Sequence, residues 1–255
     1  MDPLFVVVHE TDSFLAINKA AGIGVHDELI DRVDADGGMG EEPDAESALS
    51  HTRTDGLISH LRKVLGDQHL FPVHRLDKDT SGLMLIAKGR QATKALSELF
   101  RLREIEKFYL AVCDKKGQKK QGTIKGGMLK GRRGSWMLSQ STDNQATTQF
   151  FSYGLEHGRR VVLLKPLSGK THQLRVAMKA NGSPILGDRR YGGSASDRMY
   201  LHAFRLVFEL DGEPFDIETF PLRGEHFLCE GFRSTVKTLG APELLKWPKP
   251  PPKRH

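Results

Sequence analysis

The stretch of sequence that decides the fold is "HRLDKDTSGLMLIAK", residues 74–88. Its first half is polar and ends at a glycine, and its second half is an apolar run of strand length. One interpretation of the polar half is a turn in which Asp79, Thr80 and Ser81 hydrogen-bond to their own backbone. Another is a single nucleophilic or acid–base carboxylate that nearby cations hold in place. The residues of this stretch alone leave both interpretations open.

Two further chemistries fit residues 74–88 poorly. The segment "DKDT", residues 77–80, approaches the D-x-D-x-[TV] signature of aspartyl-phosphate phosphatases. In those enzymes the acid follows an apolar strand, whereas here the apolar run comes after it. A metal site formed by His74, Asp77 and Asp79 would need further ligands, and the chain offers no matching set of histidines and cysteines. We therefore expect neither a phosphoenzyme nor a bound metal.

The charge of the chain is divided unevenly. The 255 residues carry a formal net charge of +6. Residues 27–46 contain nine acids and one arginine, a net charge of −8, so the rest of the chain carries +14. A body this basic favours a polyanionic partner, and nucleic acid is the first candidate, with solubility alone as the alternative.

Cysteine and hydropathy patterns indicate the compartment. The two cysteines, Cys113 and Cys229, lie far apart without a metal-binding spacing, which is typical of a reducing cytoplasm. The chain has no run of eighteen or more apolar residues, so we expect no membrane span. We therefore expect a cytoplasmic protein.

Periodicity predicts many strands and a few scattered helices. Strands are expected on both sides of a turn within residues 3–22, and a hairpin is expected to turn near Asp211 and Gly212. A helix is expected from Leu57 to Leu65, with Asp55 as its N-cap and Gly66 as its stop. Further strands are expected at residues 82–89, 107–113, 146–154 and 159–165, and a further helix at residues 90–105. Without strict alternation of strand and helix, this pattern favours an α+β fold with a central, largely antiparallel mixed sheet and flanking helices.

The stretch "KPLSGKTHQLRV", residues 165–176, contains a "GKT" that resembles part of a phosphate-binding nucleotide loop. That loop needs a glycine five positions before Gly169, because its backbone must curl around the phosphates, and Leu164 stands there. The stretch is therefore no nucleotide loop. Thr171 is instead expected to cap a helix that ends at Asn181-Gly182, with Arg175 in its second turn.

Six motifs together resemble one known family. "HRLDKDTSGLMLIAK" is similar to the central H-R-L-D-x-x-T-S-G motif of the RluA-type pseudouridine synthases. The segments "LAINKAAGIGVH", "EKFYLAVC", "GKTHQLRV", "GSPILGDRRYGG" and "YLHAFRLVF" resemble further motifs of that family, in the family's order, across residues 14–208. Ala20 departs from the pattern because it stands where the family usually has proline.

The resemblance implies roles for particular residues. Asp77 would be the catalytic residue, Arg175 its ion-pair partner, and Tyr109 the aromatic side chain that stacks on the base and handles its proton. A helix start and nearby cations would lower the pKa of such a carboxylate and keep it ionised. Replacing Arg175 by alanine is accordingly expected to reduce activity far more than stability. The residues expected to bind substrate RNA are His74, Arg75, Thr80, His172, Lys130, Arg132 and Arg133. For His172 a purely structural contact is the alternative.

The implied reaction isomerises uridine to pseudouridine in structured RNA, transfer or ribosomal, without a cofactor. The carboxylate would attack the ribose or the base, or assist elimination to a glycal, and the sequence leaves these routes open. A paired uridine cannot be reached inside a helix, so the target base is expected to flip out. A protein that binds structured RNA on the same fold without catalysis is the alternative.

The motifs also suggest how the chain is organised. We expect a catalytic domain over residues 1–235, a basic and proline-rich tail over residues 236–255, and a monomer. Residues 27–55 are expected to form a long, mobile acidic insertion. The chain begins close to the first motif, without the small N-terminal RNA-binding module that some relatives carry. The basic region 115–133 is therefore the candidate RNA-binding surface, with a simple solvated hairpin as the alternative.

Overall fold

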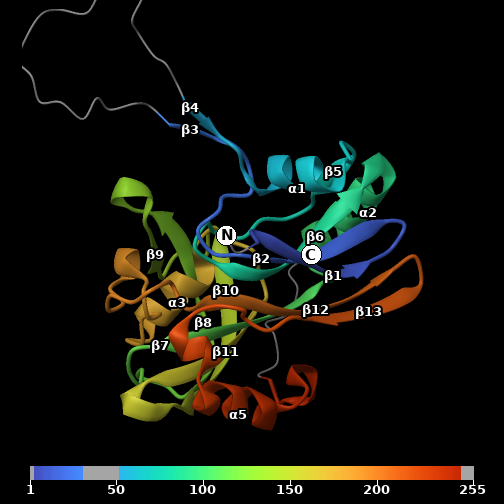
Figure 1. The fold of residues 1–255 in the computed structure, drawn as a ribbon. Helices are drawn as coiled ribbons and strands as arrows, with labels where there is room; N and C mark the ends of the chain where they lie inside the picture. Colours follow the sequence, from blue (N-terminus) through green and yellow to red (C-terminus); the bar gives the residue numbers. More distant parts are fainter. Residues whose placement is uncertain (1–2, 31–51, 248–255) are drawn as a thin grey trace, which may run out of the picture.

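The computed structural model describes residues 3–30 and 52–247, and a large mixed sheet forms its centre (Figure 1). Its strands are β1 (Phe5–Glu10), β2 (Phe14–Lys19), β5 (Leu70–Pro72), β6 (Ser81–Lys88), β7 (Glu106–Cys113), β8 (Gln121–Lys130), β9 (Trp136–Ser139), β10 (Gln145–Gly154), β11 (Arg160–Pro166), β12 (Leu201–Leu210) and β13 (Glu213–Glu218). The order is β1-β2-β6-β12-β7-β11-β10-β8-β9, with β5 beside β6 and β13 beside β12. Among these described strands only β6 and β12 pair in parallel, which confirms the predicted α+β fold with a largely antiparallel sheet.

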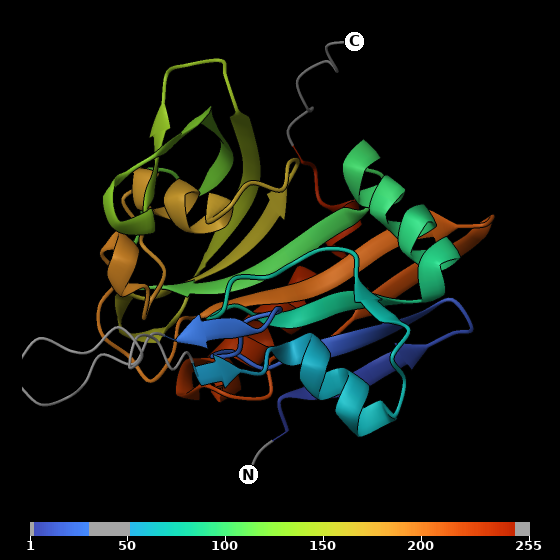
Figure 2. The same cartoon turned by 90° about the horizontal axis from the view of Figure 1, so that it is seen from above.

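Helices cover both faces of this sheet. They are α1 (Leu57–Leu65), α2 (Gly89–Leu102), α3 (Gln173–Ala180), α4 (Glu225–Leu228) and α5 (Glu230–Leu239), with 3-10 turns η1 (Arg132–Gly134), η2 (Glu156–Gly158), η3 (Arg189–Tyr191) and η4 (Pro242–Leu244). Helices α1 and α2 lie on the opposite side from α5 in Figure 1, and Figure 2 shows α2 and α3 on either side of the central strands. None of the described helices is long and apolar enough to cross a membrane.

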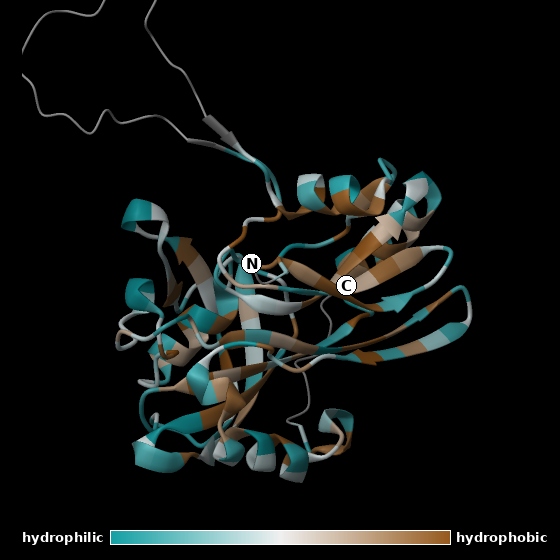
Figure 3. Cartoon of the chain, in the orientation of Figure 1, coloured by the Kyte–Doolittle hydropathy of each residue, from teal (hydrophilic) through white to brown (hydrophobic). Residues whose placement is uncertain are grey.

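Two apolar clusters hold these layers together. One joins α1 and α2 to β2 and β6, and the other joins α3 and α5 to β7 and β11. Figure 3 shows the apolar segments concentrated on the strands and on the inward sides of the helices. Strand β7 contributes to both clusters through the partly buried Tyr109, so residues of this strand lie where the two halves of the molecule meet.

The second residue of strand β6 lies at a position that only glycine fits. Gly82 has a φ of 113°, and a Cβ placed there would lie 2.2 Å from the carbonyl oxygen of Ala203 on β12. A side chain would therefore push the two parallel strands apart. This close approach brings the loop that precedes β6 to the middle of the sheet.

The N-terminal end of α1 differs from the prediction. Gly56, not Asp55, is the N-cap, and its N–H donates to Oδ1 of Asp27 at 2.8 Å. The same oxygen accepts from the Ser59 hydroxyl at 2.6 Å, while Asp55 pairs with Lys63 instead. The first two N–H groups of the helix donate to the Gly24 and Val25 carbonyls at 2.9 and 3.2 Å. The groups that cap the helix therefore come from a distant part of the chain, so the local pattern did not reveal them. The predicted stop at Gly66 is confirmed by its φ of 68°.

The acidic insertion is described only at its two ends. Strands β3 (Glu28–Ile30) and β4 (Thr52–Thr54) pair antiparallel there. These two ends therefore form a short sheet, whereas the sequence predicted a loop. Residues 31–51, on which the rest of that prediction falls, lie outside the described residues.

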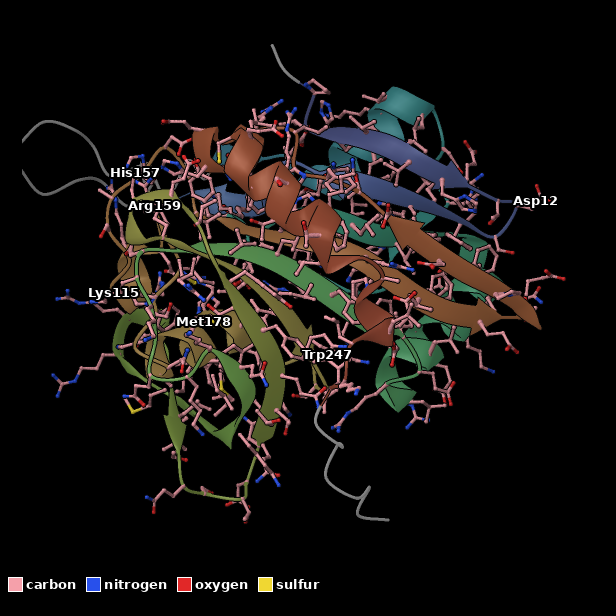
Figure 4. The ribbon with its side chains drawn as sticks, turned by 90° about the horizontal axis from the view of Figure 1, so that it is seen from below. Asp12, Lys115, His157, Arg159, Met178 and Trp247 are labelled. Carbon is pink, nitrogen blue, oxygen red and sulfur yellow. The ribbon has the colours of Figure 1, made fainter. Side chains whose placement is uncertain are left out.

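The packed part of the chain extends beyond the boundary predicted at residue 235. Helix α5 continues across residue 235, and its side chains Phe232 and Val236 are both buried. Trp247 packs edge-on against Phe151 with ring centroids 4.7 Å apart, and its Nε1 donates to the Pro242 carbonyl at 2.7 Å (Figure 4). The proline-rich composition of this segment gave no indication that these apolar side chains would pack. Residues 248–255 lie outside the described residues.

Candidate active site

A cleft opens where the loop before β6 meets the start of α3 and strand β7. Its volume is about 380 Å³, and the last turn of α2 closes one side of it. Asp77 is the only carboxylate among its described lining residues. The cations that line it are Arg75, Arg103, Lys107, Lys170 and Arg175. A single acid among five cations is an arrangement that favours an anionic ligand.

Arg175 joins two carboxylates in this cleft. Its Nη1 donates to Oδ2 of Asp77 at 3.1 Å, as the resemblance implied. Its Nε and Nη2 donate to the two oxygens of Asp188 at 2.7 and 2.8 Å, a bidentate pair. Arg175 is 6% exposed and Asp188 is 2% exposed. The guanidinium is therefore held by Asp188 in an orientation that presents Nη1 to Asp77.

The charge of Arg175 is well maintained despite its burial. Burial alone would lower the pKa of Arg175, but the hydrogen bonds and charges of Asp188 and Asp77 raise it above its ordinary value. The guanidinium also lies over the ring of Tyr191, 5.0 Å from the centroid. Arg175 is consequently a permanent cation beside Asp77.

The start of α3 differs from the prediction in its capping. The helix begins at Gln173, and its N-cap is His172, which adopts a left-handed φ of 55°. Thr171 is exposed and does not cap the helix. The Gln173 carboxamide holds the preceding turn instead, because its Oε1 accepts from the Ser168 hydroxyl at 2.8 Å and from the Lys170 N–H at 3.0 Å. Arg175 therefore lies in the first turn and not, as predicted, in the second.

His172 connects the cleft to a neighbouring tyrosine. The Tyr191 hydroxyl accepts from the Trp136 N–H at 2.9 Å and lies 2.8 Å from Nδ1 of His172. If it donates its proton to that nitrogen, the proton of the neutral ring is on Nε2, which lies 3.9 Å from Oδ2 of Asp77. Burial lowers the pKa of His172, and the charge of Asp77 partly offsets this. His172 is thus beside the carboxylate and held by side-chain contacts.

Tyr109 and Thr80 also line the cleft. Burial, and secondly the charge of Asp77, raise the pKa of the Tyr109 phenol well above its ordinary value, so the phenol remains protonated. Thr80 is 2% exposed, and its N–H donates to the Asp77 carbonyl at 3.0 Å. This bond closes the turn that carries Asp77.

His74 and Arg75 differ in their exposure and contacts. Nε2 of His74 accepts from the Leu85 N–H at 2.9 Å, and its ring stacks on Phe100 at 4.2 Å. Burial first, and the charge of Lys107 second, lower the pKa of His74 to about 3. The ring is therefore neutral and its acceptor nitrogen is already engaged, whereas Arg75 is exposed at the rim of the cleft.

The predicted basic surface residues lie on the hairpin of β8 and β9. Lys130, Arg132 and Arg133 are all exposed. The Arg190 guanidinium donates to the carbonyl of Arg133, which links the hairpin turn to η3. Because η3 also carries Tyr191, the hairpin adjoins the wall of the cleft that contains His172.

Three residues of the site carry no role in the sequence-based prediction. Asp188 and Tyr191 belong to the quoted segment "GSPILGDRRYGG", and Lys107 belongs to "EKFYLAVC". Their position within these family motifs was the one feature of the sequence that could have identified them as site residues. Nothing in the local pattern connected Asp188 to Arg175, since the two meet only after an irregular loop has folded back.

Comparisons with known proteins agree with this geometry. The model of the RNA pseudouridylate synthase family matches residues 13–180. A Haemophilus influenzae protein named an uncharacterized RNA pseudouridine synthase is 39% identical over 224 residues, which are 87% of this chain and 90% of that protein. The ribosomal large subunit pseudouridine synthase C of Rickettsia bellii is 32% identical over 209 residues, and these are 79% of this chain and 62% of that protein.

A solved structure shares the fold. Human RNA Pseudouridylate Synthase Domain Containing 1 has a TM-score of 0.68 and 25% sequence identity, and the match covers 94% of this chain and 98% of that one. The family match extends from β2 to the end of α3 and so includes Asp77, Tyr109 and Arg175. The chain therefore belongs to the RNA pseudouridylate synthase family and is an isomerase that acts on RNA.

Proposed function

We propose that this protein converts uridine to pseudouridine in structured RNA with Asp77 as its catalytic carboxylate. The observation that carries the proposal is the position of Asp77, which is the only described carboxylate lining the cleft and accepts from Arg175 at 3.1 Å. A carboxylate held by a fixed cation is oriented for attack on carbon or for stabilising a developing positive charge. Both the covalent and the glycal route need this group and no other acid.

The neighbouring residues supply the remaining functions. Arg175 orients Asp77, and the protonated Tyr109 faces the same cleft, where its ring can stack on a flipped uracil. A phenol with a raised pKa favours donating a proton or a hydrogen bond over accepting a proton. His172 and Thr80 support the loop and helix start on which the acid depends.

The proposed substrate is structured ribosomal or transfer RNA. The name of the Rickettsia bellii relative makes the RNA of the large ribosomal subunit the first to examine. The target uridine must leave its helix or loop to enter the cleft, at a cost of about a few kcal/mol that is smallest in loops. We propose that the protein acts as a monomer in the cytoplasm, and that the catalytic domain includes the chain up to Trp247.

Pseudouridine mapping of total RNA tests the proposed function. Cells with and without this chain should differ at one or a few uridines, and the purified protein should restore the modification in RNA from the deficient cells. Identical maps, together with tight binding of the same RNA, would identify the protein as a non-catalytic binder.

The exposed hairpin of β8 and β9 is expected to contact phosphates. Replacing Lys130, Arg132 and Arg133 together by alanine should lower the slope of log affinity against log salt by about 2 to 3, since each phosphate contact contributes about 0.7 to 0.9. Filter binding to ribosomal RNA over a range of KCl concentrations measures this slope. An unchanged slope would remove the hairpin from the RNA-binding surface.

A matched control removes the same charge from another face. Arg233, Lys237 and Lys246 are exposed on and after α5. Replacing these three by alanine lowers the net charge equally, and we expect the slope to change much less. Equal changes in both triple variants would show that net charge, and not the hairpin, determines binding.

A further inference from the structure

Lys107 on β7 is a buried cation without a partner among the described residues. It is 8% exposed and lines the cleft. Two other lysines of low exposure are fully accounted for: Lys19 donates to three carbonyls at 2.8, 2.9 and 3.1 Å, and Lys165 pairs with Glu106 at 2.7 Å. In the described residues Lys107 forms no hydrogen bond or ion pair. Its Nζ lies 6.0 Å from the centroid of the Phe100 ring.

This position is costly for an ammonium group, although its nitrogen still reaches the solvent of the cleft. Burial first, and the charge of Arg103 second, lower the pKa of Lys107. A buried charge normally has a partner of opposite sign, because desolvation of an unpaired ion is expensive. An anion in the cleft beside Lys107 would supply this partner and would also reduce the repulsion from Arg103.

The distance from the reacting group suits a phosphate. Lys107 and Tyr109 are two residues apart on β7, so their side chains point to the same face about 7 Å apart. The charge of Asp77 raises the pKa of Tyr109, so this tyrosine lies at the end of the cleft that contains Asp77. Lys107 is thus about one nucleotide unit away from where the uracil and its ribose would lie, at the end of the cleft that Phe100 and Arg103 close.

We propose that Lys107 binds a phosphate of the RNA backbone adjoining the target uridine. This inference rests on the proposed function and extends it by naming the group that aligns the nucleotide with Asp77. The phosphate accepts from the Lys107 ammonium, Phe100 covers the other side of the side chain, and Arg103 adds a second positive charge. Lys107 is a substrate-binding residue in this account and takes no part in proton transfer.

A comparison of nucleoside and nucleotide binding isolates this contact. Uridine, uridine 5′-monophosphate and uridine 3′-monophosphate are titrated into the protein and followed by NMR. The wild-type protein should bind at least one monophosphate about tenfold more tightly than uridine, as expected for a charged hydrogen bond in a desolvated site. In Lys107→Met, which keeps most of the length of the side chain and removes its charge, most of this preference should disappear while uridine binding stays unchanged.

Two variants control for packing and for charge. Lys107→Arg should retain part of the preference, since it keeps the positive charge. Lys165→Met removes a partly buried lysine outside the cleft on the neighbouring strand β11 and should retain all of it. Lys107→Gln serves as a second neutral variant if the methionine variant does not fold.

Each outcome separates this inference from the proposed function. A wild-type protein that binds uridine and both monophosphates equally would overturn the phosphate site, and so would a preference that persists in Lys107→Met or Lys107→Gln. Conversion of RNA is measured separately by pseudouridine mapping. A protein that converts RNA without any phosphate preference would refute only the role of Lys107. A protein that prefers a monophosphate over uridine but converts no RNA would refute only the catalysis.

Discussion

An Asp77→Asn variant should release tritium from RNA labelled at uracil carbon 5 about a thousandfold or more slowly than the wild-type protein. Asparagine keeps the shape of the side chain and can still accept from Arg175, whose Nη1 lies 3.1 Å from Oδ2 of Asp77. It loses the negative charge and most of the nucleophilicity. No other described carboxylate lines the cleft, so none can replace it. Single-turnover release is the measurement, and binding of the same RNA should stay within a few fold.

Asp79 is the matched control for Asp77. It follows two residues later in the same loop, but it is exposed and does not line the cleft, and its charge acts on Arg198, which does not line the cleft either. Asp79→Asn should therefore retain nearly all of the release. Release at the wild-type rate from Asp77→Asn, or equal loss in both variants, would refute Asp77 as the catalytic carboxylate.

The main elements of the fold were predictable because their signals are local. Helices α1 and α2 have clear apolar periodicity, and the turn at Asp211-Gly212 between β12 and β13 has two residues that tolerate positive φ. The order of strands in the sheet was not predictable, because β6 and β12 are separated by more than a hundred residues when they pair. Helices α4 and α5 were missed since their buried faces are only a few residues wide.

The site was predictable in part, and mainly through resemblance. The motifs indicated Asp77 and Arg175 as a pair, and the structure brings them together at 3.1 Å. The second partner of Arg175 was not predictable, since Asp188 lies in an irregular loop after α3 whose path depends on tertiary contacts. The N-cap was predicted wrongly at Thr171 because the Gln173 side chain, not a threonine hydroxyl, satisfies the backbone of the turn.

The contacts of Asp188 change what should be expected of Arg175→Ala. The sequence suggested a loss of activity with little loss of stability, because only the partner Asp77 was apparent. The structure shows that the substitution also leaves Asp188, 2% exposed, as an uncompensated buried carboxylate. Breaking such a buried pair costs about 3–5 kcal/mol. We therefore expect Arg175→Ala to lose turnover by orders of magnitude and also to unfold at markedly lower denaturant concentration.

A paired substitution separates these two effects. Arg175→Met combined with Asp188→Leu removes both charges of the buried pair and fills the space, so stability should recover to near the wild-type value. Activity should remain lost, because Asp77 still lacks its cation. Chemical denaturation and single-turnover tritium release are measured on the same preparations. Recovery of turnover together with stability would show that Arg175 serves the fold alone. Unrecovered stability would show that Asp188 is not the partner whose isolation destabilises Arg175→Ala.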